Sequence, residues 1–132
     1  MTITFIDAGV LILAARGEPD SAVKAMAVLD DPAREFASSE FVRLEVLPKA
    51  IYYRNAAEVK FYELFFNSVK HWAQVSETLL EEAYHEASQT GLAALDALHI
   101  AAAASVKADE FVTTEKPEKL IHRTTLVKVV SV

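Results

Sequence analysis

Short apolar segments rich in β-branched and aromatic residues alternate along this chain with longer segments of helical periodicity. This alternation is typical of α/β domains, in which helices join successive strands and the strands therefore run parallel. The sequence thus predicts an α/β fold with a mostly parallel central sheet flanked by helices. The expected strands are residues 3–6, 34–37, 72–75 and 110–114, with a last strand within residues 125–132.

The segments between these strands carry residues that typically begin or end helices. Gly9 permits a tight turn before a short buried helix, and Asp20 or Ser21 can cap the second helix. The expected helices are residues 10–17, a second one whose apolar face holds Ala22, Ala25, Met26 and Leu29, a third at 41–54 that is capped by Ser38 or Ser39 and bent by Pro48, a fourth after Asn55, a fifth from Ser76 to Gly91, a sixth at 92–106, and a helical turn at 116–120.

Length and composition indicate one compact domain. The chain has 132 residues, 52% of them hydrophobic, which is enough for a substantial core. It contains no Gly/Ser-rich or Pro-rich linker, no apolar run long enough to cross a bilayer and no signal-peptide pattern. We therefore expect a single domain over residues 1–132, in a cytoplasmic protein without a membrane segment.

Charge and the lack of cysteine exclude several kinds of function. The sequence contains no Cys, which excludes a disulfide framework, a thiolate zinc site and a cysteine nucleophile. The formal net charge of −6 argues against binding nucleic acid through a generally basic surface, because phosphate contacts need Lys or Arg. The remaining metal ligands are carboxylates and four His.

Four acidic residues stand out by their positions. Asp7 and Glu115 follow the first and fourth expected strands, and ligands of parallel sheets bind beyond such carboxyl ends. Glu45 lies about two turns into a helix on its inward side, and Asp96 interrupts an Ala-rich helix. Converging carboxylates repel one another unless a cation offsets their charge, and hard oxygen ligands favour Mg²⁺ or Mn²⁺. Such a cation can position a phosphate and activate water, which is the chemistry of phosphodiester hydrolysis.

Four segments together resemble the PIN-domain ribonucleases, and especially the small VapC-type toxins of bacterial toxin–antitoxin pairs. In chain order, they are FIDAGVLI, SSEFVRLEVLPKA, LAALDALHIAAAA and EFVTTEKPEKL. By position, Asp7, Glu45 and Asp96 match the family's first three acids. Glu115 matches a fourth acid that is more often Asp. The resemblance implies that these four residues are catalytic and hold Mg²⁺ or Mn²⁺.

The resemblance also implies an activity and partners. It implies a PIN-like fold and a metal-dependent endoribonuclease that hydrolyses phosphodiester bonds of RNA as the toxin of a toxin–antitoxin pair. It further implies a small antitoxin protein as partner and a homodimer that places two acidic sites near one groove.

Two departures from the family pattern leave an alternative function open. Ala8 and Gly9 stand where the family commonly has Ser or Thr followed by Asn or Ser, so contacts that orient a metal ligand are missing. Glu115 is one methylene longer than Asp, and Pro117 changes the segment that follows it. The alternative is a PIN-like domain with a weakened metal site that acts as an RNA-binding or protein-binding module.

Each acid also has a structural interpretation. Asp7 can cap the next helix, and Glu45 can pair with Lys49 four residues later. Asp96 can favour a helix dipole, and Glu115 can lie in a solvated turn.

Neighbouring polar residues have interpretations of their own. His99 can pair with Asp96 at helical spacing, which is a more common role than binding a metal. Thr113 and Thr114 can support a metal-bound water through a hydroxyl. A haloacid-dehalogenase-like phosphatase is disfavoured because Gly9 stands where its second Asp would be.

Overall fold

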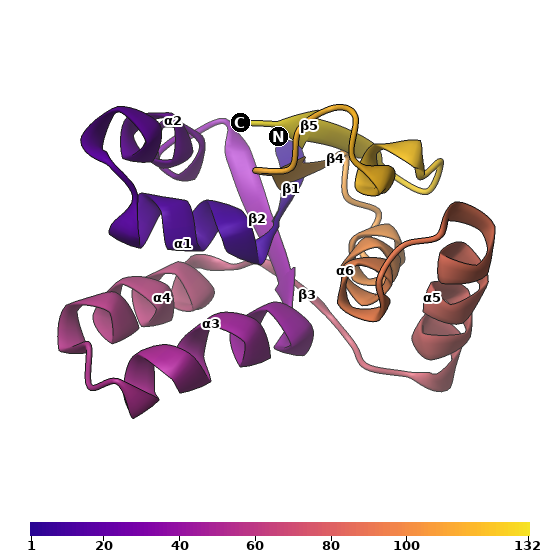
Figure 1. Cartoon of the computed structure of the whole chain (residues 1–132), viewed down its shortest axis with the longest axis horizontal. Coiled ribbons are helices and arrows are strands. Elements are labelled where there is room, and N and C mark those ends of the chain that lie inside the picture. The colour runs from indigo at the N-terminus through magenta and orange to yellow at the C-terminus, as the bar shows by residue number, and fades with distance from the viewer.

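The computed structural model describes residues 1–132 and shows a five-stranded sheet between two groups of helices (Figure 1). All four strand pairs are parallel, and the order across the sheet is β3-β2-β1-β4-β5. The predicted α/β fold with a mostly parallel sheet is therefore confirmed. The strands are β1 (Thr2–Ile6), β2 (Arg34–Ser39), β3 (His71–Ala73), β4 (Glu110–Thr113) and β5 (Lys128–Ser131).

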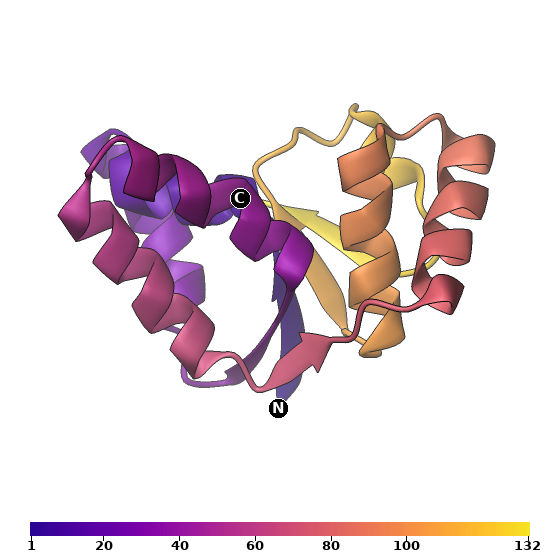
Figure 2. The ribbon, with the colours of Figure 1, turned by 90° about the horizontal axis from the view of Figure 1, so that it is seen from below.

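Helices cover both faces of the sheet. In Figures 1 and 2, α1 to α4 lie on one side of it, and α5 and α6 lie on the other. No helix combines the length and the apolar character needed to span a membrane. The helices are α1 (Ala8–Arg16), α2 (Pro19–Leu29), α3 (Glu40–Tyr52), α4 (Ala56–Ser68), α5 (Glu77–Thr90), α6 (Ala94–Ser105) and the 3₁₀ helix η1 (Leu120–Arg123).

The order of the strands reverses at β1. The chain runs outward from β1 to β2 and β3, and then returns to the other side of β1 to form β4 and β5. At such a reversal, the carboxyl ends of the two central strands leave a crevice in which ligands bind. Strands β1 and β4 are neighbours and pair from Thr4 with Glu110 to Ile6 with Val112. The residues that follow these two strands therefore lie at one crevice.

The core consists of apolar side chains from the central strands and from the helix faces that cover them. Phe5 of β1 and Phe111 of β4 are fully buried, and their rings stack with centroids 5.5 Å apart. Burying a side chain of this size contributes about 1.5–3 kcal/mol. Helix α6 buries mainly small side chains, including Ala97 and Ala101, which let it lie close to its neighbours. A well-packed core thus supports the carboxyl ends of β1 and β4.

Three local predictions are wrong. Gly9 is the second residue of α1 and not part of a turn. Helix α2 begins at Pro19, because the fixed φ of proline suits the first helical position, so neither Asp20 nor Ser21 caps it. Residues 116–119 form a turn, closed by a hydrogen bond from the Lys119 N–H to the Lys116 carbonyl, and the short helix begins only at Leu120.

A candidate acidic site at the β1–β4 crevice

Asp7 directly follows β1 and caps α1, at the carboxyl end of the central strands. Its Oδ1 accepts a hydrogen bond from the Ala8 N–H at 2.9 Å, so Asp7 caps α1 as one sequence interpretation predicts. Its Oδ2 accepts a hydrogen bond from the Thr113 hydroxyl at 2.7 Å. The residue is only 8% exposed. Because each carboxylate oxygen has a second lone pair, Asp7 can cap the helix and still bind a ligand.

Two threonines, from β4 and from the turn after it, lie beside Asp7 and Gly9. Thr113 supplies the hydroxyl that orients Asp7, and its Oγ1 also accepts a hydrogen bond from the Glu115 N–H at 3.1 Å. A Cβ atom on Gly9 would lie 2.6 Å from the Thr114 Oγ1, so the Thr114 side chain occupies the space of a side chain at position 9. A hydroxyl from the neighbouring strand thus orients Asp7, although Ala8 and Gly9 carry none.

Glu45 is held by a histidine from another element. The His99 Nε2 lies 2.8 Å from the Glu45 Oε1, and His99 is 1% exposed whereas the Glu45 side chain is 34% exposed. No ion pair forms between Glu45 and Lys49. His99 also does not pair with Asp96 as expected. Its imidazole contacts Glu45 on α3 instead of Asp96 on its own helix.

Asp96 and Glu115 border one cavity beside the crevice. Asp96 is partly buried in the first turn of α6, and Glu115 is exposed after β4. Both line a cavity of about 400 Å³, together with the apolar side chains of Leu92 and Ile121 and the cationic side chain of Lys119. The cavity is large enough for part of a nucleotide-sized ligand.

Burial and nearby charges act on the carboxyls of Asp7 and Asp96. Burial raises the pKa of the Asp7 carboxyl above its ordinary value of 3.8; His99 and the Thr113 hydrogen bond oppose this rise, and Asp96 and Glu45 add to it. Burial likewise raises the pKa of Asp96. The charges of Glu115 and Glu45 raise it further, whereas His99 lowers it.

Neither Asp7 nor Asp96 has an ion-pair partner, and Glu115 has none either. His99 lies beside Glu45, but the other three carboxylates lack an ion pair, and bringing such groups together is costly.

The donor chemistry of this cluster fits a hard divalent cation, although the side chains do not form a closed metal cage. No three acidic or histidine side chains lie close enough together to hold one metal ion. Mg²⁺ is usually bound through one or two carboxylates, with waters and substrate phosphates completing its shell. A nearly buried Asp7 without a cationic partner, beside three further carboxylates, offers such ligands.

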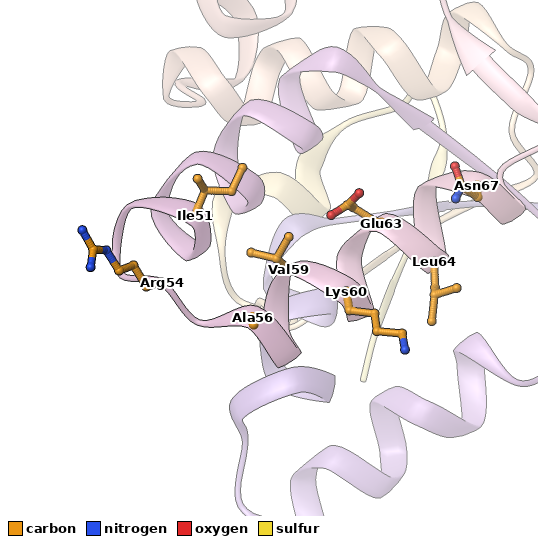
Figure 3. Close-up of a pocket in the computed structure, with 8 residues that line it drawn as sticks. All are labelled: Ile51, Arg54, Ala56, Val59, Lys60, Glu63, Leu64 and Asn67. Carbon is orange, nitrogen blue, oxygen red and sulfur yellow. The ribbon is translucent and has the colours of Figure 1, made fainter.

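Another cavity lies between the end of α3 and α4. It measures about 460 Å³, and none of the four acids lines it. Figure 3 shows the charged side chains of Arg54, Lys60 and Glu63 around it, near the apolar side chains of Ile51 and Leu64. This surface is therefore separate from the acidic site.

Two solved structures are similar to this chain over almost its whole length. A chain of the crystal structure of VapBC2 from Rickettsia felis, bound to a DNA fragment from their promoter, is 17% identical with a TM-score of 0.74, covering 98% of each chain. A chain of a toxin-antitoxin complex from Klebsiella pneumoniae is 18% identical with a TM-score of 0.71, covering 97% of this chain and 96% of that one. At these identities the likeness concerns the fold alone. No curated protein matches the sequence.

The family model described as PIN domain matches residues 4–116. This span begins within β1, ends just after β4 and includes Asp7, Glu45, Asp96 and Glu115. The resemblance of the sequence segments to PIN-domain proteins is thus confirmed, and the chain belongs to the PIN-domain family.

Proposed function

We propose that this chain is a metal-dependent endoribonuclease that hydrolyses phosphodiester bonds of RNA, with Asp7, Glu45, Asp96 and Glu115 as its metal-binding and catalytic residues. The observation that carries the proposal is the nearly buried Asp7, which has no cationic partner and lies within electrostatic range of two further acids at the β1–β4 crevice. Membership of the PIN-domain family supports the assignment of all four acids to one site.

In this proposal, three of the four acids have distinct roles. Asp7 is fixed by two hydrogen bonds and forms the rigid part of the site. Asp96 and Glu115 border the cavity in which a phosphate and its neighbouring nucleotide would lie, and Lys119 contributes a cationic group to its wall. Bound Mg²⁺ or Mn²⁺ would supply charge neutralisation for the phosphate and activation of the attacking water.

The proposal is tested by incubating the purified protein with a mixed RNA pool in the presence of Mg²⁺ or Mn²⁺, or of EDTA. We expect cleavage with either metal and none with EDTA. Asp96→Asn protein, purified in parallel, controls for a contaminating nuclease. Folded protein that leaves the RNA intact under all conditions would contradict the proposal.

An RNA-binding or protein-binding module with a weakened metal site is the second candidate function. It is favoured by the finding that no three potential ligands lie close enough together to hold one ion. The two functions differ in their response to Mn²⁺. Stoichiometric binding of Mn²⁺ favours the nuclease, whereas RNA binding without cleavage and without Mn²⁺ binding favours the module.

We further propose that the protein acts in the cytoplasm as the toxin of a toxin–antitoxin pair, as a homodimer bound by a small antitoxin. Two proteins of the same fold come from toxin–antitoxin structures. Helices α3 and α4, and the residue that follows α3, also expose apolar side chains that suit a protein partner. These are Leu44, Ile51, Tyr52, Tyr53 and Leu64. Light scattering of the purified chain would give a dimer mass, and a monomer at high concentration would contradict the homodimer.

A further inference from the structure

His99 is a buried polar residue in an apolar, Ala-rich helix. It is 1% exposed, and the residues around it on α6 are mostly small and apolar. Its Nδ1 has no hydrogen-bond partner, and its Nε2 has one, the Glu45 Oε1 at 2.8 Å. Burying an imidazole with one nitrogen unpaired costs free energy, so an apolar residue would serve the core better. The gain that offsets this cost lies in the contact with Glu45.

The hydrogen bond between His99 and Glu45 joins the two helical layers of the molecule. Glu45 is on α3 and His99 is on α6, and these helices lie on opposite sides of the sheet in Figures 1 and 2. A carboxylate can only accept hydrogen bonds, so the His99 Nε2–H is the donor. Asp96 lies three residues before His99 on the same helix. One helix therefore carries Asp96 and also fixes the position of Glu45.

Glu45 needs such a restraint to remain at the site. Its side chain is one-third exposed and has several rotatable bonds, so solvent competes for it, and ordering it has an entropic cost. His99 is almost immobile because it is buried on all sides. His99 is thus a rigid donor, and its hydrogen bond restrains a Glu45 side chain that would be mobile without it.

We propose that His99 is a positioning residue that holds the Glu45 carboxylate toward Asp7 and Asp96 for binding of a divalent cation. The inference rests on the proposed metal-dependent function. Loss of a partner that orients a metal ligand typically lowers metal affinity by about 10-fold to 100-fold.

A second His–Glu pair in the chain provides a matched control. His71 begins β3, and Glu35 lies within β2. The His71 Nε2 lies 3.1 Å from the Glu35 Oε1. Glu35 is not among the charges that influence Asp7 or Asp96. The same chemical contact is therefore available at a place unrelated to the acidic site.

The test is calorimetric titration of Mn²⁺ into the wild-type protein and the variants His99→Gln, His99→Met and His71→Met. Gln and Met have similar lengths, but only Gln can donate a hydrogen bond to Glu45. We expect His99→Met to bind Mn²⁺ about 10-fold to 100-fold more weakly. His99→Gln should retain most of the wild-type affinity, and His71→Met should retain all of it. Thermal unfolding in EDTA reports whether each variant is folded.

The same substitution in a Glu45→Gln background separates positioning from a structural role. A positioning role requires that His99→Met has little further effect on Mn²⁺ affinity once the carboxylate of Glu45 is gone. Equal weakening in both backgrounds, unchanged affinity in His99→Met, or failure of both His99 variants to fold would overturn the proposal and leave the nuclease function standing. If the wild-type protein binds no Mn²⁺, the proposed metal-dependent function fails together with this inference.

Discussion

At the scale of single residues, the site depends on short side chains that leave room for others. Gly9 lies in the first turn of α1, where Ala would be the better helix former by about 0.5–1 kcal/mol. Its lack of a Cβ atom makes room for the hydroxyl of Thr114, which lies next to Thr113. Thr113 in turn orients Asp7. The departure from the family pattern at position 9 is thus coupled to the β4 end of the crevice.

This coupling predicts a non-additive response to substitution. Gly9→Ala would place a Cβ atom 2.6 Å from the Thr114 Oγ1, whereas the Thr114 Cβ lies at an acceptable 3.7 Å. We expect Gly9→Ala to be less favourable in the wild-type protein than in a Thr114→Ala background by about 1 kcal/mol, because overpacking costs about that much or more. Urea unfolding of the four proteins of the cycle measures the difference. Equal effects of Gly9→Ala in both backgrounds would contradict this account of the glycine.

Asp7 predicts a pH-dependent stability in the absence of metal. Burial raises its pKa in the folded state above the ordinary value of 3.8, so the folded state binds more protons than the unfolded state between these two pKa values. The contribution of the Asp7 carboxyl to the free energy of unfolding is therefore fully present below pH 3.8. It is lost as the pH rises through the raised pKa of the folded state. The Tm of Asp7→Asn, which does not titrate, should exceed that of the wild-type protein increasingly as the pH rises from acidic to neutral in EDTA.

Asp31→Asn is the control, because the pKa of Asp31 is lowered and its effect on Tm should change with pH in the opposite direction. Hydrogen bonds from the Ala33 N–H and from Arg34 lower the pKa of Asp31, so its contribution is present at neutral pH and is lost as the pH falls. The Tm of Asp31→Asn should therefore lie below that of the wild-type protein at neutral pH and approach it in acid. A Tm difference for Asp7→Asn that does not change with pH would contradict the raised pKa of Asp7.

At the scale of secondary structure, the local signals in the sequence identify most helix ends correctly. Ser39, Asn55 and Ser76 each accept a hydrogen bond from a backbone N–H in the first turn of the following helix, as predicted. Gly91 ends α5 with a φ of +80°. Capping is a contact between neighbours in the chain, so residue type predicts it well. It fails at α2, where Pro19 overrides two nearby candidates.

The end of α5 offers a prediction about backbone strain. Gly91→Ala would meet only the Leu120 Cδ1 at 3.8 Å, an ordinary contact, so its cost comes from the left-handed conformation alone. We expect the free energy of unfolding to fall by about 1–2 kcal/mol. Gly91→Asn should lose less, because Asn tolerates this conformation better. Urea unfolding compares the two variants, and equal losses would point to a cause other than backbone strain.

At the scale of the whole molecule, the candidate site lies where the strand order reverses. The carboxyl ends of β1 and β4 bring Asp7 and Glu115 to one crevice, and the helices after β2 and before β4 add Glu45 and Asp96. The net charge of −6 disfavours the binding of RNA, the proposed substrate, unless the proposed cation is bound. Metal binding and RNA binding should therefore be linked.

Sequence alone predicts the elements, the parallel sheet and the positions of the four acids along the elements. It does not predict the contacts between side chains that are far apart in the chain. His99 and Glu45 are 54 positions apart, and Asp7 and Thr113 are 106 positions apart. The spacing of His99 from Asp96 favours a contact within one helix, and only the packing of α6 against the rest of the molecule brings its imidazole to α3 instead.

Metal removal tests this description of the whole molecule. Mn²⁺ at about 100 times its dissociation constant should raise the free energy of unfolding by about 2.7 kcal/mol, since the proposed ligands lie together only in the folded state. Thermal unfolding should show a higher Tm with Mn²⁺, reversed by EDTA, and a much smaller shift for Asp96→Asn. A Tm that does not respond to Mn²⁺ would contradict a folded metal site.

The most direct measurement is the single-turnover rate of RNA cleavage in Mn²⁺ for Asp7→Asn, Glu45→Gln, Asp96→Asn and Glu115→Gln. Glu81→Gln, an exposed acid on α5, serves as control. We predict that the first three variants lose at least about 100-fold, because even partners that only orient metal ligands cost 10-fold to 100-fold. Glu115→Gln should lose less, because this residue is exposed, and Glu81→Gln should match the wild-type protein. Full metal-dependent cleavage by Asp7→Asn or Asp96→Asn would contradict a single acidic site at the β1–β4 crevice.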